Sequence, residues 1–136
     1  MNLYTAAQTR ELDRIAIEEL GIPGIRLMGR AGRAAFDVVL EEWPQVTSLH
    51  VFCGTGNNGG DGFILAELAH SRGISVRVYQ LGDPDKISAD ALLAQQRMLQ
   101  SGVVVENWSP DLMLTSDLEP GCSVIVDALL GTGLTG

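Results

Sequence analysis

The fold of this chain is decided by the stretch Gly54-Thr55-Gly56-Asn57-Asn58-Gly59-Gly60-Asp61-Gly62. An apolar segment with strand character precedes it, and a segment with helical character follows it. Because glycine has no Cβ, the backbone here can adopt positive φ values, let its N–H groups converge and approach a ligand closely. The two asparagines and the aspartate add side-chain donors and acceptors. We therefore expect a polar binding cradle at a strand-to-helix junction.

The composition is that of an ordinary globular domain. The chain has 136 residues, of which 46% are hydrophobic and 19% charged, so it can bury one core and shows no bias toward disorder. No apolar run approaches the ~20 residues that a membrane-spanning helix needs. The start of the chain lacks the basic and apolar regions of a targeting segment. We expect one domain over residues 1–136, cytoplasmic and not bound to a membrane.

The formal net charge of −8 argues against one class of partner. Binding to nucleic acid without sequence specificity needs clustered Lys and Arg side chains, which this chain lacks. An anionic ligand would have to be held by backbone amides. Cys53 and Cys122 follow no metal-binding or redox spacing, so we interpret them as packing residues. Structural or solvated roles are also expected for His50, His70, Arg30 and Arg33.

The apolar pattern predicts two N-terminal helices followed by alternating strands and helices. A capping-box pattern at Thr5 begins a helix that ends at Gly21, and a second helix follows Gly24 and is closed by Trp43-Pro44. The apolar face expected for this second helix is Leu27, Ala31, Ala34, Ala35, Val38 and Val39. Strands are expected at 48–53, 75–80, 103–107 and 123–128, with helices at about 62–72 and 88–100. This alternation predicts an α/β fold with a parallel sheet, right-handed crossovers and helices on both faces.

Two features of this pattern predict further structure around them: two glycines within a helix, and a glycine-rich loop at the end of the chain. Gly29 and Gly32 lie inside the second helix, where each costs up to about 1 kcal/mol relative to alanine, so we expect another backbone to approach them closely. The last residues, 131–136, form a glycine-rich loop directly after a strand, where a further helix and strand would normally cover the sheet. We therefore expect a domain that is truncated at its C-terminal end.

The expected site lies at the carboxyl edge of the sheet, where open parallel sheets bind their ligands. If strands 48–53 and 123–128 are neighbours, with the strand order 3-2-1-4, the glycine stretch and the loop 131–136 share one crevice. Asp127 would then present a carboxylate to that crevice from the end of a rigid strand.

Two common nucleotide-binding motifs fit this site poorly. The glycines satisfy the spacing G-x-G-x-x-G, but Tyr79-Gln80-Leu81 occupies the place where a ribose-binding acid is expected, roughly 20 residues further on. A P-loop is excluded because Gly60 and Asp61 stand where Lys and Ser or Thr should follow Gly59. An ordinary NAD-dependent dehydrogenase and an NTPase are therefore disfavoured.

The remaining donor set consists of oxygens. Oxygen ligands suit hard cations, and carbonyl oxygens of low charge suit potassium, so Asn58 and Asp127 are candidate K⁺ ligands. A purely structural alternative stays open. In that interpretation Asp61 caps the following helix, and Asn57 and Asn58 are turn residues in the left-handed region.

Three segments together resemble a known family. The stretch 51–62 closely resembles the defining motif of the YjeF N-terminal domain family, the NAD(P)H-hydrate epimerases. The opening, from Leu12-Asp13 through Gly21-Ile22-Pro23 to 27–32, resembles the start of that family, and the segment 124–134 resembles its second site loop. The resemblance implies a Rossmann-like three-layer αβα sandwich with a mainly parallel sheet.

The resemblance also implies an isomerase of nicotinamide cofactor repair. Such enzymes interconvert the R and S forms of hydrated NADH and NADPH (NADHX and NADPHX) at C6 of the nicotinamide ring. An ADP- or ATP-dependent dehydratase, fused in some proteins, then restores the cofactor. Because C6 is a hemiaminal carbon, epimerisation needs a general acid/base and stabilisation of developing charge. The alternative function is a noncatalytic module of the same fold that binds a nucleotide or a protein, and the sequence leaves open whether the chain forms a homo-oligomer.

The family's site residues carry over to matching positions of this chain. The hydrate would be contacted by Asn57, Asn58, Gly59, Gly60 and Asp61. The phosphate region would be contacted by Gly131, Thr132, Gly133, Leu134, Thr135 and Gly136. Potassium would be held by Asn58 and Asp127. The acid/base stays unassigned, because the family's later Asp-x-Pro-Ser-Gly-like motif does not occur in these 136 residues.

Overall fold

The computed structural model describes residues 24–109 and 121–129, so the helix expected at 5–21 and the loop expected at 131–136 lie outside the described residues. Four strands form one parallel sheet in the order β3-β2-β1-β4. Their bounds are β1 (Val46–Cys53), β2 (Ser75–Gln80), β3 (Val105–Asn107) and β4 (Cys122–Ala128). The α/β class and the parallel pairing are therefore confirmed, and the condition stated for a shared crevice, that strands 48–53 and 123–128 are neighbours, is met.

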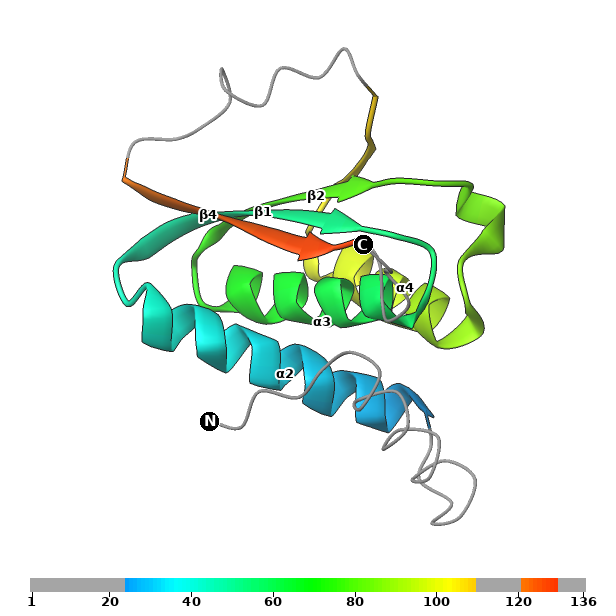
Figure 1. Ribbon diagram of the computed structural model, residues 1–136, viewed down its shortest axis with the longest axis horizontal. Helices are drawn as coiled ribbons and strands as arrows, with labels where there is room; N and C mark the ends of the chain where they lie inside the picture. Colours follow the sequence, from blue (N-terminus) through cyan, green and yellow to red (C-terminus); the bar gives the residue numbers. More distant parts are fainter. Residues whose placement is uncertain (1–23, 110–120, 130–136) are drawn as a thin grey trace, which may run out of the picture.

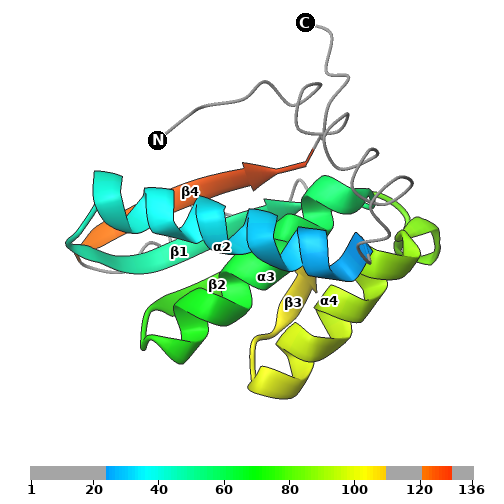
Figure 2. The same cartoon turned by 90° about the horizontal axis from the view of Figure 1, so that it is seen from below.

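The helices of the described part are α2 (Gly24–Glu42), α3 (Asn57–Ser71) and α4 (Ala89–Ser101), with a short 3₁₀ turn, η1 (Pro84–Lys86). Figures 1 and 2 show that α2, α3 and α4 all lie on the same face of the sheet. Residues 24–109 and 121–129 thus supply two layers, and the helices expected on the opposite face are not among them. Within the same residues, no helix has the length and apolar content needed to cross a membrane.

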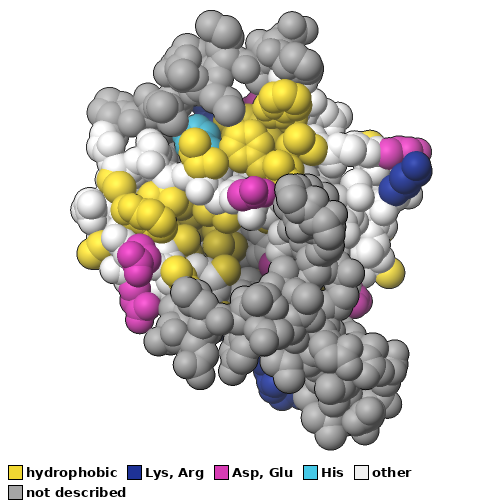
Figure 3. Space-filling view, in the orientation of Figure 1, with side chains coloured by type: hydrophobic (Ala, Val, Ile, Leu, Met, Phe, Trp, Pro, Cys, Tyr) yellow, Lys and Arg dark blue, Asp and Glu magenta, His cyan; other side chains and the backbone are white. Residues whose placement is uncertain are grey.

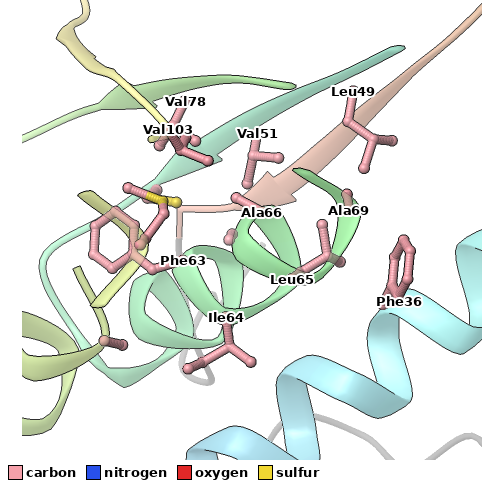
Figure 4. Close-up of a cluster of buried hydrophobic side chains, with 14 of the residues drawn as sticks. Phe36, Leu49, Val51, Phe63, Ile64, Leu65, Ala66, Ala69, Val78 and Val103 are labelled. Atoms are coloured by element: carbon pink, nitrogen blue, oxygen red, sulfur yellow. The ribbon is translucent and has the colours of Figure 1, made fainter. Parts of the chain in front are cut away.

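Strand β1 shows how the sequence pattern builds the core. Leu49, Val51 and Cys53 alternate along the strand and are fully buried beneath the helices. Figure 4 shows Leu49 and Val51 pointing from the sheet toward α3, while Ile64 points from α3 toward α2. Helix α3 is thus covered both by the sheet and by α2 and α4, which explains why its apolar residues are not confined to one stripe.

Helix α2 buries a face that agrees only in part with the one expected, since Val39 is buried and Ala35 packs against the core. Its buried residues are Met28, Gly32, Phe36 and Val39, whereas Ala34 of the expected face is exposed. A Cβ on Gly32 would collide with the side chain of Ile64 and lie 3.0 Å from the Asp61 carbonyl oxygen, so the close approach expected at Gly32 is confirmed. At Gly29 the same expectation is wrong, because nothing lies within 4 Å of its would-be Cβ. The contact with α3, rather than the number of alanines, selects the buried face.

The opposite face of the sheet is partly apolar. Figure 3 shows hydrophobic side chains gathered on the surface in the region of the strands. Tyr79 of β2 stacks on Phe52 of β1, with 4.9 Å between ring centroids. His50 is buried and its Nδ1 lies 3.2 Å from the Tyr79 hydroxyl, which confirms a structural role for this histidine. His70, Arg30 and Arg33 are exposed on their helices, as expected.

Candidate functional site at the carboxyl edge of the sheet

The glycine stretch divides into a short turn, residues 54–56, which we call the glycine turn, and the first turns of a helix. Strand β1 ends at Cys53, only Gly54, Thr55 and Gly56 intervene, and α3 begins at Asn57. The predicted helix start near residue 62 is therefore wrong by one and a half turns. Gly59, Gly60 and Gly62 are poor helix formers, but all three are buried against neighbouring elements. Tertiary packing therefore compensates for their low helix propensity.

The glycines of this stretch serve close packing rather than unusual backbone angles. The glycines with positive φ in the described part of the chain are Gly73, Gly82, Gly102 and Gly121, so the positive φ values expected within 54–62 are not adopted. A Cβ on Gly54 would collide with the Leu129 carbonyl oxygen, and one on Gly59 would collide with the Gly54 carbonyl oxygen. The close approach seen at these two glycines is therefore to the protein's own backbone, whereas the predicted close approach was to a ligand.

The N-terminus of α3 is arranged to receive an anionic or carbonyl oxygen. Gly56 is its N-cap and supplies no side chain to the first-turn N–H groups. Such groups have no acceptor within a helix and carry the positive end of the helix dipole. Asp61 lies in the second turn and is not the cap, and Asn57 and Asn58 are helical rather than left-handed. The structural alternative for these three residues is therefore wrong, and the amide cradle at this junction stays a prediction that an uncapped helix N-terminus is compatible with.

The side chain of Asn57 has a partner that the sequence did not reveal. Its Oδ1 accepts a hydrogen bond of 2.8 Å from the Ser88 hydroxyl, 31 residues further along the chain. The sequence does mark Ser88 as the start of a helix, and Ser88 is indeed the N-cap of α4. Its contact with Asn57 could be found only once the fold had brought the two helix N-termini together.

Gln80 occupies the place at the end of β2 where the dinucleotide fingerprint has an acid. It is buried, and its Nε2 donates to the carbonyl oxygens of Cys53 and Gly54, each at 3.1 Å, and of Leu81 at 3.0 Å. No described residue donates to its Oε1. This carboxamide therefore fixes the backbone where β1 enters the glycine turn, instead of reaching toward a ribose.

The end of β4 completes the described part of the site. Phe52 of β1 pairs with Asp127, and the Gly54 N–H donates to the Ala128 carbonyl oxygen at 3.0 Å. Asp127 is exposed, and its Oδ1 accepts from the Leu129 N–H at 3.0 Å. The prediction that Asp127 stands at the end of a strand beside the glycine turn is therefore confirmed. The second loop, 131–136, lies outside the described residues.

The donor set at this edge suits a weakly charged oxygen site better than a transition-metal site. Residues 24–109 and 121–129 contain no group of three or more His, Cys, Asp or Glu side chains that could hold a metal ion. Asp127 keeps its second carboxylate oxygen beyond the contact with Leu129, and Asn58 brings a carboxamide to the start of α3. Carboxamide and carboxylate oxygens of low total charge fit potassium.

The thiol of Cys53 has a strongly raised pKa. Burial beneath the glycine turn raises the pKa of its thiol from 9.0 to about 12. A thiol with so high a pKa is a poor nucleophile at neutral pH. Together with the free, half-buried Cys122, Cys53 is therefore a packing residue, as the sequence predicted.

This shift makes the stability of the fold depend on pH. Between the unfolded pKa of 9.0 and the folded pKa of about 12, the unfolded chain binds fewer protons than the folded one. Stability must then fall as the pH rises. We expect Cys53 to contribute a loss of about 1.4 kcal/mol per pH unit across this window. Urea unfolding between pH 8 and pH 11 should show a shallower loss in Cys53→Ala than in the wild type and Cys122→Ala, and equal slopes would contradict the assignment.

The chain is similar in sequence to proteins of one known family. The family described as YjeF-related protein N-terminus matches residues 24–136. A bifunctional NAD(P)H-hydrate repair enzyme Nnr from Coxiella burnetii is 42% identical over 134 residues, which are 98% of this chain and 26% of that protein. An NAD(P)H-hydrate epimerase from Rhodobacter capsulatus is 34% identical over an alignment of 140 positions that covers 98% of this chain and 63% of that protein.

A solved structure shares the fold. The crystal structure of yeast ynu0 superposes with a TM-score of 0.76 at 21% sequence identity, and the match covers 96% of this chain and 57% of that one. This similarity supports the same α/β arrangement. The chain spans between 26% and 63% of the length of the Coxiella and Rhodobacter proteins.

Proposed function

This chain belongs to the family described as YjeF-related protein N-terminus, and from that premise we propose that it forms the substrate-binding edge of an NAD(P)H-hydrate epimerase. The observation that carries the proposal is the position of the α3 N-terminus, which has no side-chain cap and lies at the same sheet edge as Asp127. Two relatives named for NAD(P)H-hydrate epimerisation or repair align with 98% of the chain.

The chemistry of the substrate agrees with this edge. A hydrated nicotinamide dinucleotide offers a pyrophosphate, a carboxamide and the C6 hydroxyl. Backbone N–H groups of the first turn of α3 and the Asn57 carboxamide would donate to such oxygens, which suits a chain whose net charge is −8. Epimerisation at C6 breaks and re-forms the carbon–oxygen bond, either by loss and re-addition of water or by opening and closure of the ring. The role proposed for these residues is to bind and orient the hydrate while a separate acid/base moves the proton.

We also propose that Asn58 and Asp127 hold a potassium ion. A bare carboxylate beside an anionic dinucleotide would repel it, and a bound monovalent cation would offset that repulsion. The exposed position of Asp127 and its single described contact, through Oδ1, leave carboxylate oxygen available for the cation. A dehydratase would consume the S hydrate, and the name of the Coxiella relative, a bifunctional repair enzyme, favours an arrangement in which both activities share one chain.

An enzyme assay coupled to a dehydratase tests the proposal. A mixture of R and S hydrates is supplied to the full-length protein together with a dehydratase that consumes only the S form, and the recovery of reduced cofactor is followed by absorbance. The expected result is complete recovery, because the R form is converted continuously. If R hydrate is consumed only at its spontaneous rate, the protein is not an epimerase. Tight hydrate binding without turnover would identify a noncatalytic module instead.

A further inference from the structure

The segment 81–88, which connects β2 to α4, is hydrogen-bonded at one end to the last residue of β1 and at the other end to the glycine turn. The Leu81 N–H donates to the Cys53 carbonyl oxygen, and the Ser88 N–H donates to the Thr55 carbonyl oxygen, each at 3.0 Å. Gly82, with a φ of 86°, places its backbone against the Thr55 side chain. A segment that follows the neighbouring strand thus belongs to the same site as the glycine turn.

Ser88 makes two different bonds with one hydroxyl. Its Oγ accepts from the Ala91 N–H at 3.4 Å as the N-cap of α4, and it donates to Asn57 Oδ1 at 2.8 Å. A hydroxyl has a single proton, so the cap uses a lone pair and the proton is committed to Asn57. With Oδ1 engaged, the two N–H groups of the Asn57 carboxamide face away from Ser88.

We propose that Ser88 is a positioning residue that fixes the Asn57 carboxamide with its NH₂ group toward the substrate. This inference rests on the proposed function, in which Asn57 contacts the hydrate. The bond makes Asn57 a donor of the same kind as the backbone N–H groups of the first turn of α3. The ligand atom that Asn57 meets is therefore an oxygen acceptor, and a rotated carboxamide would present an acceptor that repels it.

The variants must separate this role from helix capping. Ser88→Gly removes the hydroxyl, yet glycine is only a few tenths of a kcal/mol worse than serine as an N-cap. Ser88→Thr keeps both the lone pair and the proton. Ser101→Ala is the matched control, because Ser101 lies at the far end of α4 and its hydroxyl bonds the Met98 carbonyl oxygen.

The test is a double-mutant cycle in the full-length enzyme, with KM for the hydrate as the readout. We expect Ser88→Gly to raise KM about fivefold with little change in kcat, because ground-state and transition-state binding weaken together. Ser88→Thr and Ser101→Ala should stay near the wild-type KM. In an Asn57→Ala background, Ser88→Gly should have almost no further effect, because coupled residues are not additive. An equal effect of Ser88→Gly in both backgrounds would reduce Ser88 to a helix cap and overturn the inference.

A second readout keeps this inference separate from the proposed function. In the ligand-free protein, the side-chain amide signals of Asn57 in a ¹⁵N-labelled sample should shift in Ser88→Gly and stay in place in Ser101→Ala. If the signals do not move, the orienting bond is absent and the inference fails, whatever the enzyme does. If they move but the wild type shows no epimerisation, the proposed function fails and the orienting role of Ser88 stands.

Discussion

Gly59→Ala is expected to destabilise the domain by about 3 kcal/mol or more, near the upper end of overpacking effects. The new Cβ would collide with the carbonyl oxygen of Gly54 and lie 2.9 Å from its carbonyl carbon. Gly54 has no room to yield, because its N–H is bonded to Ala128 and its carbonyl oxygen to Gln80. Against a typical total stability of 5–15 kcal/mol, this loss should lower the unfolding temperature by about 6–12 °C, at about 2–4 °C per kcal/mol for a protein of about 150–250 residues.

Gly56→Ala is the matched control for this experiment. Gly56 belongs to the same motif, but nothing lies within 4 Å of its would-be Cβ, and its φ of −86° suits alanine. The loss of folding stability in Gly56→Ala should stay within about 1 kcal/mol, the usual difference between glycine and alanine at an N-cap. If both variants unfold at the same temperature in circular dichroism, the motif is not packed as described. Glycine would then be required at Gly59 for ligand access alone.

Asp127→Asn is expected to lower kcat/KM for the hydrate about 100-fold and to remove most of the activation by potassium, a magnitude typical for loss of a group that supports a bound metal. The substitution is nearly isosteric, and asparagine can still accept the Leu129 N–H through Oδ1. It therefore removes the negative charge while keeping the local turn. Rates should be measured over a range of potassium chloride concentrations, with ionic strength held constant by tetramethylammonium chloride.

Asp37→Asn provides the comparison for Asp127→Asn. Asp37 is also an exposed carboxylate, but it lies on α2, outside the proposed site. Its removal should leave both the rate and the potassium dependence unchanged. A wild-type rate that is the same with and without potassium would refute the cation assignment. If the wild type depends on potassium and the Asp127→Asn variant keeps the same dependence, the cation is bound by residues other than Asp127.

Much of the fold could be predicted from local sequence. Short apolar segments located both strands: β2 has the predicted bounds, and β1 begins two residues before the predicted start, at Val46. Ser88 and Gly102 marked the ends of α4, and both act there, as an N-cap and as a left-handed C-cap. The short strand β3 was predicted two residues too long, since Val103 is buried but not paired in the sheet.

Part of the candidate site was also visible in the sequence. The parallel-sheet rule placed Asp127 at the same edge as the glycine turn, and the pairing of β1 with β4 in the structure makes the two adjacent. The contacts of Gln80 with β1 and of Ser88 with Asn57 were not predictable, because they join residues about 30 positions apart in elements whose relative orientation no local pattern encodes.

The sequence by itself determined the strands, their parallel pairing and the edge at which a ligand would bind, because these follow from the pattern of apolar segments and from the connectivity of parallel strands. Only the tertiary structure decided where α3 begins and why its glycines are needed. Glycine disfavours a helix locally, yet a Cβ on Gly60 would collide with Met28, and one on Gly62 would lie 2.8 Å from both Cys53 and Ala128. The space left by their missing side chains is filled by α2, α4 and the sheet, so packing that is distant in sequence turns a predicted loop into the first turns of a helix.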